Sequence, residues 1–306
     1  HERFPMTTTK PSGGTVNTVL GPVPATELGV VAAYEALLSV VPGAEHAHDI
    51  TIDRAEVVAD LVAQLNAFKA AGGGTVVDAS GMFHGRNVPL LEAVSRATGV
   101  HVVASTGMGP EENLGGYFKT PQTNPPTPWP ADRFAELFTA EVTEGMVVPR
   151  IERRAAAGLV VTAGTAGGLT GTDESLLRGA ARTAAATGAP MAFRFGADPL
   201  AELDLVLAEG IDPARVLVAG LDRRDAAGAA VAVAGKGALV GLTQVGTASD
   251  DLLDDEERAD LVVELVAAGH RDRIVLASGA IGVAKGLPDP GVAYEHVLST
   301  FVPLLA

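Results

Sequence analysis

The stretch GLVVTAGTAGGLTGTDESLLRGAARTAAATGAPMAFRF (158–195) contains the repeating unit that decides the fold. It starts with a short β-branched run bounded by glycines, which is typical of a strand buried on both faces. The TDES sequence that begins at Thr172 is a capping-box pattern, and Gly188 ends the helix predicted over 172–187. A second apolar run (189–195) follows. This strand–helix–strand order predicts a parallel α/β unit.

The same alternation extends over the chain. Short apolar runs bounded by Gly, Asp or Ser lie at 29–35, 74–80, 100–105, 158–164, 189–195, 215–221, 237–243 and 273–279. Helices are predicted at 52–71, 172–187, 200–209, 222–234, 254–268 and 292–305. A doubly wound sheet would need a Gly-rich turn after its first strand, and that turn is missing. Eight such units in roughly 250 residues predict an α/β fold consisting of a single (β/α)8 TIM barrel.

Composition excludes several classes of function. Of 306 residues, 22 are Lys or Arg and 37 are Asp or Glu, so the formal net charge is −15. An acidic chain is unsuited to nucleic acid and to anionic lipid, because both require clustered basic side chains. The chain has no cysteine, which excludes disulfides, thiol nucleophiles and Cys-based zinc sites.

The first residues of the chain are predicted to lie outside the barrel domain. Residues 1–14 are predicted to be a cloning remnant and a disordered leader, which leaves 15–306 for the barrel domain. The leader has no apolar core, and the longest apolar run, 29–41, is too short to span a bilayer. We therefore expect a cytoplasmic protein with no membrane contact.

Six segments carry a family resemblance in collinear order. They are TVLGPVPATELGVVAAYEALL (18–38), VVDASGMFHGRNVPLL (76–91), GVHVVASTGM (99–108), LTGTDESLLRGAARTAAATGAP (169–190), RVLVAGLDRRD (215–225) and GHRDRIVLASG (269–279). Together they resemble the phosphotriesterase-like family of the amidohydrolase superfamily. The resemblance implies a short N-terminal β-hairpin before strand one, and it implies a homodimer.

The resemblance also implies a binuclear metal centre, whose ligand positions carry other residues in this chain. These positions fall on Tyr34 and Ala36 (the HxH pair of strand one), Val161 or Thr162 (the bridging residue), Arg194 (strand five), Gly220 (strand six) and Gly279 (strand eight). A divalent transition metal needs three or more N, O or S ligands at ~2 Å. Ala, Val and Gly supply none, and Arg repels a cation. This alignment predicts no metal and no cofactor.

One alternative metal site stays open. His46 and His48 form an HxH string about ten residues after the expected position. Pro42, Gly43 and Ala44 precede this string and indicate a loop, so solvated histidines are the favoured interpretation. A metal-dependent hydrolase with a displaced site is nevertheless retained as an alternative.

Four residues are predicted to carry chemistry in a metal-free pocket. Arg194 points inward and must meet an anion, because a buried unpaired charge is costly. That anion is either a protein carboxylate, with Asp222 and Asp78 as candidates, or a carboxylate, phosphate or oxyanion of a substrate. Tyr34 would donate or accept a proton, and His84, on the loop after strand two, would be the general base. Asp222 completes the predicted catalytic set.

Five further side chains are predicted to bind substrate: Arg223, Ser278, Thr162, Asp78 and Trp129. Arg223 follows strand six, and Ser278 starts a Gly-rich segment (278–286) that would cradle a phosphate. Trp129 belongs to the irregular stretch 108–130, which is expected to be either a binding loop or a surface loop held by its own aromatic residues. Glu35 alternates with the pocket positions and is predicted to be structural.

Three functions follow from these observations. The leading hypothesis is a metal-independent enzyme that acts on a small anionic or carbonyl-containing substrate by acid–base chemistry, in the manner of a hydrolase, lyase, isomerase or cyclase. The second is a catalytically inactive relic that binds a small ligand or a protein partner. The third is the metal-dependent hydrolase with a displaced site.

Overall fold

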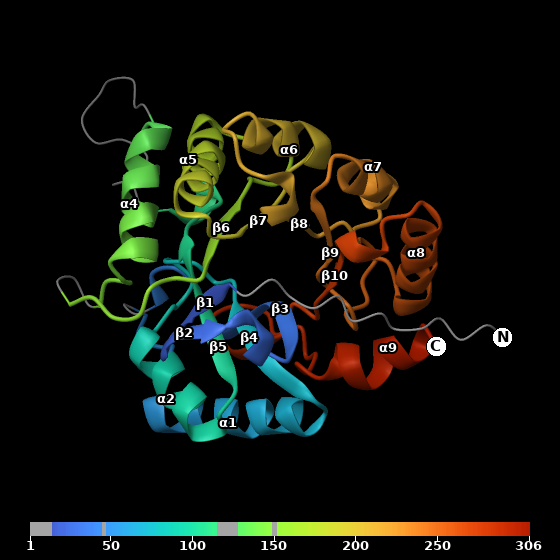
Figure 1. Ribbon diagram of the computed structural model, residues 1–306. Helices are drawn as coiled ribbons and strands as arrows, with labels where there is room; N and C mark the ends of the chain where they lie inside the picture. Colours follow the sequence, from blue (N-terminus) through green and yellow to red (C-terminus); the bar gives the residue numbers. More distant parts are fainter. Residues whose placement is uncertain (1–13, 45–46, 115–127, 149–151) are drawn as a thin grey trace.

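The strands of the barrel lie side by side in sequence order. The computed structural model of the chain describes residues 14–44, 47–114, 128–148 and 152–306. Within these residues, parallel strands form a curled sheet in the order β10-β9-β8-β7-β6-β5-β4-β3-β11. The strands are β3 (Val30–Val40), β4 (Gly73–Asp78), β5 (His101–Gly107), β6 (Leu159–Ala163), β7 (Met191–Arg194), β8 (Val216–Ala219), β9 (Leu239–Leu242), β10 (Ile274–Leu276) and β11 (Ile281–Lys285). Figure 1 shows the helices arranged around them.

The eighth strand of the barrel is interrupted, and its two halves close the ring. The first half, β10, pairs in parallel with β9, whereas the second half, β11, pairs in parallel with β3. The Glu35 carboxyl group holds the interruption, because its two oxygens accept hydrogen bonds from the backbone N–H of Ser278 (3.0 Å) and of Ala280 (2.5 Å). The strand predicted at 273–279 is present but shorter, as β10, and β11 was not predicted. The TIM barrel itself is confirmed.

The helices lie outside the strands. They are α1 (Arg54–Ala70), α2 (Val88–Thr98), α4 (Ala131–Thr143), α5 (Gly171–Thr187), α6 (Pro199–Leu207), α7 (Ala230–Gly235), α8 (Asp255–Ala267) and α9 (Val302–Leu304). The capping box of α5 uses Thr170 and Asp173, two residues earlier than predicted. No element of the described chain is both long and apolar enough to be a membrane-spanning helix.

Two predicted helices are shorter than expected, and two observed helices were missed. The segment predicted as a helix over 222–234 becomes helical only at Ala227, because Asp222 is fully buried and binds strand ends instead. The segment 292–305 forms a π-helix over Val297–Phe301 followed by α9. Helices α2 and α4 occupy stretches for which the sequence analysis gave no helix bounds.

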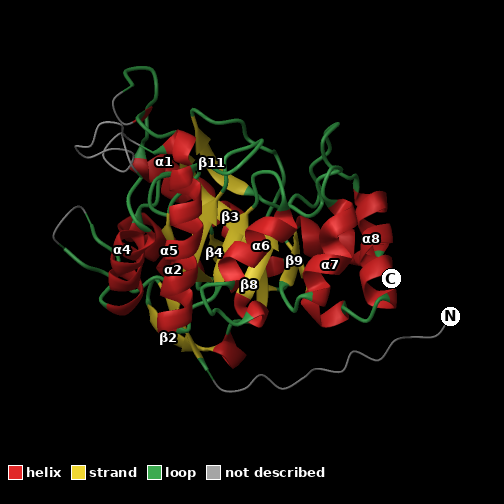
Figure 2. Ribbon diagram, turned by 90° about the horizontal axis from the view of Figure 1, so that it is seen from above, coloured by secondary structure: helices red, strands yellow, loops and turns green. Residues whose placement is uncertain are grey.

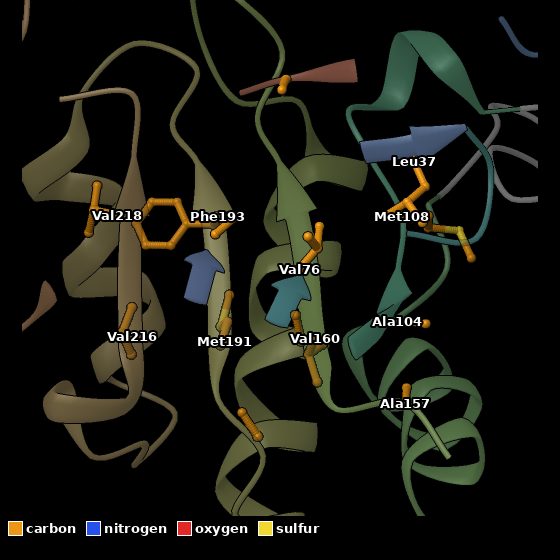
Figure 3. Packing of buried hydrophobic residues seen from close by; sticks show 14 of the residues in the cluster. Leu37, Val76, Ala104, Met108, Ala157, Val160, Met191, Phe193, Val216 and Val218 are labelled. Carbon is orange, nitrogen blue, oxygen red and sulfur yellow. The ribbon is translucent and has the colours of Figure 1, made fainter. Parts of the chain in front are cut away.

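Side chains alternate between two hydrophobic layers. Met191 and Phe193 of β7 and Val218 of β8 belong to the large core around the strands, part of which is shown in Figure 3. Ala192 and Leu217, which alternate with them, belong to a second cluster inside the barrel. The two layers hold the strands between the helices and a packed barrel interior.

A bulge in β3 decides which of its side chains point into the barrel. The register of β3 against β4 shifts between Ala32 and Glu35. As a result, Ala33 lines a cavity at the N-terminal end of the barrel, whereas its neighbour Tyr34 lines a pocket at the other end. The bulge therefore places Tyr34 and Ala36 at the C-terminal face, where barrel active sites lie.

The predicted N-terminal hairpin is present. It consists of β1 (Thr15–Thr18) and β2 (Gly21–Pro24), which pair antiparallel. Figure 2 shows β2 at the end of the barrel opposite β11. Asn17 Nδ2 donates to the Ala157 carbonyl at 3.2 Å, and the Val19 N–H donates to the Val102 carbonyl at 2.9 Å. The hairpin is thus attached to the N-terminal ends of β5 and β6.

Candidate active site

A pocket of about 310 Å³ opens among the C-terminal ends of the strands. The residues that line this pocket come from several different strands and from the loops that follow them. The residues that line it include Tyr34, His84, Thr162, Arg194, Gln244 and Gly279. The structure therefore brings together three of the four predicted catalytic residues and one predicted substrate-binding residue.

Arg194 ends β7 and supplies the positive charge of the pocket. Its side chain lines the pocket, in agreement with the predicted inward direction, but it is exposed rather than buried. None of the ion pairs formed among the described residues includes Arg194, and neither Asp222 nor Asp78 is its partner. A guanidinium at the rim of a concave pocket without a carboxylate partner is available to an anionic ligand.

Tyr34 lies on the floor of the pocket, against the apolar cluster inside the barrel. Burial raises the pKa of its phenol above the usual value of 10, and the positive charge of Arg194 offsets part of that increase. The phenol is therefore protonated at neutral pH. It can donate a hydrogen bond or a proton to a ligand in the pocket.

His84 lies on the loop after β4, beside Gly109. Burial lowers the pKa of the imidazole, and the positive charge of Arg194 lowers it further, although the hydrogen bond with Gly109 acts in the opposite direction. The imidazole is thus neutral at neutral pH. Its Nε2 lies 3.4 Å from the Gly109 carbonyl oxygen, which accepts from Nε2–H in one tautomer. That tautomer leaves Nδ1 with the free lone pair required of a base.

Two further polar side chains line the pocket, which Glu35, Ser39 and Ser80 also border. Thr162 Oγ1 donates to the Met108 carbonyl at 2.9 Å and so attaches β6 to the loop after β5. Gln244 follows β9 and was missed by the sequence analysis. Its position directly after a predicted strand is the signal that could have found it, because barrel sites are built from residues at strand ends.

Asp222 and Asp78 lie outside the pocket, where they bind backbone groups. Asp222 pairs with Arg258 at 3.0 Å and accepts from the N–H groups of Thr243 and Gln244. Asp78 accepts from the N–H of Leu37 at 2.9 Å and from Ser80. Both carboxylates are almost completely buried. This placement favours a structural role for each of them over the predicted roles in catalysis and binding.

Three predicted binding residues are also absent from the pocket lining. Arg223 pairs with Asp225 at 2.6 Å, and its guanidinium lies 4.6 Å from the centre of the Phe195 ring. Ser278 is buried, and its hydroxyl has no hydrogen-bond partner among the described residues. Trp129 is buried beside Phe134, with a ring separation of 5.4 Å. Their binding roles therefore stay predictions without support from this arrangement.

The positions that the sequence analysis assigned to family metal ligands meet at this pocket, apart from Gly220, but their side chains do not fit a metal. Tyr34, Ala36, Thr162, Arg194 and Gly279 line it, together with Val161. Among the described residues, no group of three or more His, Cys, Asp or Glu side chains is arranged to hold a metal ion. His48 is exposed on its loop, and His46 lies outside the described residues.

The backbone at two of these positions is unsuited to a ligand-bearing residue. Gly220 and Gly279 have φ angles of 84° and 62°, which side-chain-bearing residues rarely adopt. A Cβ at position 279 would lie 2.6 Å from both the Thr243 carbonyl oxygen and Gln244 Nε2. A side chain at position 279 would therefore require the backbone to move.

Comparison with known proteins gives the family. The Phosphotriesterase family model matches residues 14–306. The chain belongs to the phosphotriesterase family. Among phosphotriesterase-family relatives, the "Phosphotriesterase homology protein" of Mycobacterium tuberculosis is 26% identical over 301 residues, which cover 95% of this chain and 90% of the relative. The "N-acetyltaurine hydrolase" of Tetraodon nigroviridis is 24% identical over 260 residues, with coverage of 78% and 69%.

Solved structures of phosphotriesterase-family proteins superimpose on the barrel of this chain. "Structure of the phosphotriesterase from Mycobacterium tuberculosis" superimposes with a TM-score of 0.82 and 25% identity, covering 95% of this chain and 91% of that one. An organophosphorus hydrolase mutant from Deinococcus radiodurans superimposes with a TM-score of 0.79 and 25% identity, covering 95% and 90%. The similarity thus extends over nearly the whole phosphotriesterase-family barrel.

Proposed function

We propose that this member of the phosphotriesterase family is a metal-independent hydrolase for a small anionic substrate with an acyl, ester or lactone carbonyl. One observation carries the proposal: the Arg194 guanidinium, which has no carboxylate partner among the described residues, shares a pocket with a neutral His84 and a protonated Tyr34. An anion site beside a base and a proton donor is the minimum set for acid–base hydrolysis. The metal-independent part of the proposal rests on the chemistry of the lining, since Tyr34, Ala36, Val161, Arg194 and Gly279 supply no imidazole or carboxylate, and no cluster of three or more potential ligands occurs in the described part of the chain.

Each residue has a separate role. Arg194 binds the anionic group and orients the substrate. His84 Nδ1 takes a proton from water as the water oxygen forms a bond to the carbonyl carbon. Tyr34 donates a hydrogen bond to the oxygen that becomes negative. As the bond to the leaving group breaks, the His84 imidazolium returns the proton to that group, so the enzyme ends in its starting state.

The choice of hydrolysis rests on the family, since its named relatives are hydrolases of several kinds. The choice of an anionic acyl compound rests on Arg194 and is in keeping with one relative: N-acetyltaurine, for which the Tetraodon nigroviridis protein is named, contains a sulfonate and an amide. A pocket of about 310 Å³ also limits the ligand to a small molecule.

A binding and turnover screen tests the proposal. Small N-acyl amino acids, acidic lactones and phosphate esters would be tested by thermal shift and for hydrolysis, with the wild-type chain, Arg194→Gln and His84→Gln. We expect Arg194→Gln to lose the thermal shift. We expect His84→Gln to keep that shift but to lose about 10²-fold to 10⁴-fold in rate. Equal shifts for wild type and Arg194→Gln would remove Arg194 from the site.

The inactive relic remains the second candidate, because apolar side chains fill the barrel beneath the pocket. Leu159, Val161, Ala192 and Leu217 form a buried cluster there, and Tyr34 packs against it. This candidate predicts ligand binding that depends on Arg194 but no hydrolysis of any bound compound. The same screen therefore separates it from the enzyme.

A further inference from the structure

A second cavity, of about 200 Å³, opens at the N-terminal end of the barrel, on the far side of the packed interior from the pocket described above. Its walls come from strands around the ring. The lining is aliphatic and includes Val31, Ala33, Val77, Leu217, Leu239 and Val275. The proposed function makes no use of this cavity.

Small residues in the barrel interior leave this cavity open. TIM barrels usually fill their interior with layers of bulky branched side chains. Here the inward positions include Ala33 and Ala192, and Gly158 lines the cavity where a side chain would collide with Val103. Val31 and Val77 are consequently only half-buried, although they face the inside of the barrel. Half-buried aliphatic walls in a concave cavity favour an apolar occupant.

A single charge lies at the rim. Among the described residues that line the cavity, only Arg215 is charged. Its side chain is exposed, and Nη1 donates to the carbonyl of Gly188 at the end of α5, which anchors the guanidinium. The other N–H groups of the guanidinium form no hydrogen bond with the described residues. They are therefore free to bind an anion beside the aliphatic walls.

We infer that this cavity binds a straight-chain alkyl carboxylate, with the alkyl chain between the barrel walls and the carboxylate on Arg215. The walls are concave and enclosed by strands, so a slender chain fits them better than the surface of another protein. The positive rim selects an anionic headgroup over a neutral or cationic one. This inference is independent of the reaction proposed for the other end of the barrel.

Titration calorimetry with butanoate, hexanoate, octanoate and decanoate tests the inference. We expect affinity to rise about fourfold for each added methylene until the cavity is full. Octan-1-ol and octyltrimethylammonium are the headgroup controls and should bind more weakly than octanoate. Arg215→Gln should weaken octanoate binding about twofold to fivefold, since the guanidinium is exposed to solvent.

Variants at both ends of the barrel locate the binding. Ala33→Leu and Val31→Phe fill the cavity and should weaken octanoate more than butanoate, and melting temperatures check that both variants fold. Arg194→Gln, in the other pocket, should keep the binding of octanoate and the rise of affinity with chain length, even if it loses binding of butanoate at the proposed substrate site. The inference is overturned by failure of the wild-type chain to bind octanoate, by affinity independent of chain length, by equal binding of octyltrimethylammonium, or by loss of binding in Arg194→Gln rather than in Arg215→Gln.

Discussion

At the scale of single residues, burial sets the direction of the pKa shifts of His84 and Tyr34, and the charge of Arg194 modifies both. This charge lowers the pKa of His84 and opposes the burial that raises the pKa of Tyr34. Both effects act toward catalysis at neutral pH, because they favour an unprotonated base and a phenol that can still release its proton. The guanidinium therefore has an electrostatic role even before a substrate binds.

This coupling predicts a measurable pKa change. In Arg194→Gln, the pKa of His84 should rise toward its ordinary value of about 6.5, because the positive charge that opposes protonation is gone. An NMR titration of the His84 ring in wild type and Arg194→Gln measures this change in pKa. Arg215→Gln removes a charge at the opposite end of the barrel and should leave the His84 titration unchanged. An unchanged His84 pKa in Arg194→Gln would show that the two side chains do not interact.

Residue positions in the pocket were predictable only in part. Arg194, Tyr34 and Thr162 were found because they occupy aligned positions on strands, and His84 because it follows one. Asp222 and Asp78 look like catalytic acids in a sequence. Their burial and their bonds to backbone N–H groups depend on which loops lie beside them, and that is set by tertiary packing. Gln244 lies in no sequence motif that would have indicated a role in the pocket.

At the scale of elements, buried carboxylates hold the strand ends that shape the pocket. Glu35 binds the interruption of the eighth strand, and Asp222 binds the end of β9. Glu202 accepts from the N–H groups of Gly196 and Ala197, directly after β7. The bulge in β3 has no clear sequence signal, since it lies within the apolar run 29–35. The break in the eighth strand coincides with Ser278 and Gly279, but these residues were predicted to be the end of the strand and the start of a binding loop.

Glu35 predicts a pH dependence of stability. Burial raises its pKa from 4.5 to about 8, although the N–H groups of Ser278 and Ala280 act to lower it. Between these values the folded chain keeps a proton that the unfolded chain has lost, so the unfolding free energy contributed by Glu35 falls as pH rises from 4.5 to 8. Glu35→Gln should flatten this part of the curve.

Urea unfolding of wild type and Glu35→Gln at several pH values measures the difference. The variant should also be less stable at low pH, by about 1–3 kcal/mol, because its amide can accept from only one of the two buried N–H groups. Glu56→Gln, on the exposed face of α1, is the matched control and should follow the wild-type curve. Parallel curves for wild type and Glu35→Gln would contradict the raised pKa.

The buried pair of Asp222 and Arg258 predicts a large structural effect. Both side chains are fully buried and lie 3.0 Å apart. Arg258→Met leaves the Asp222 charge buried without its partner and should cost about 3–5 kcal/mol of unfolding free energy. Lys236→Met, which breaks the exposed pair with Asp204, should cost no more than about 1 kcal/mol. Equal costs in urea unfolding would show that the Asp222 pair is not structural.

At the scale of the whole molecule, the barrel was predictable because its strands and helices repeat locally along the chain. Each short apolar run between glycines and each capped helix carries its own signal, and the order of these signals excludes most other folds. The side chains that line the pocket follow no such repeat along the sequence. It depends on which side chains meet from distant strands, and the aligned family positions supplied that information in advance.

Metal binding is a property of the whole molecule, because the positions aligned with family metal ligands come from five different strands. A metal bound to the folded chain at 100 times its dissociation constant would add about 2.7 kcal/mol of stability, which chelation would remove. We expect dialysis against EDTA, followed by zinc or manganese, to leave the melting temperature unchanged. Gly279→Asp should lower that temperature without creating metal-dependent stability, since φ is 62° and Thr243 blocks its Cβ. A melting temperature that falls on chelation and recovers with metal would instead indicate a displaced metal site.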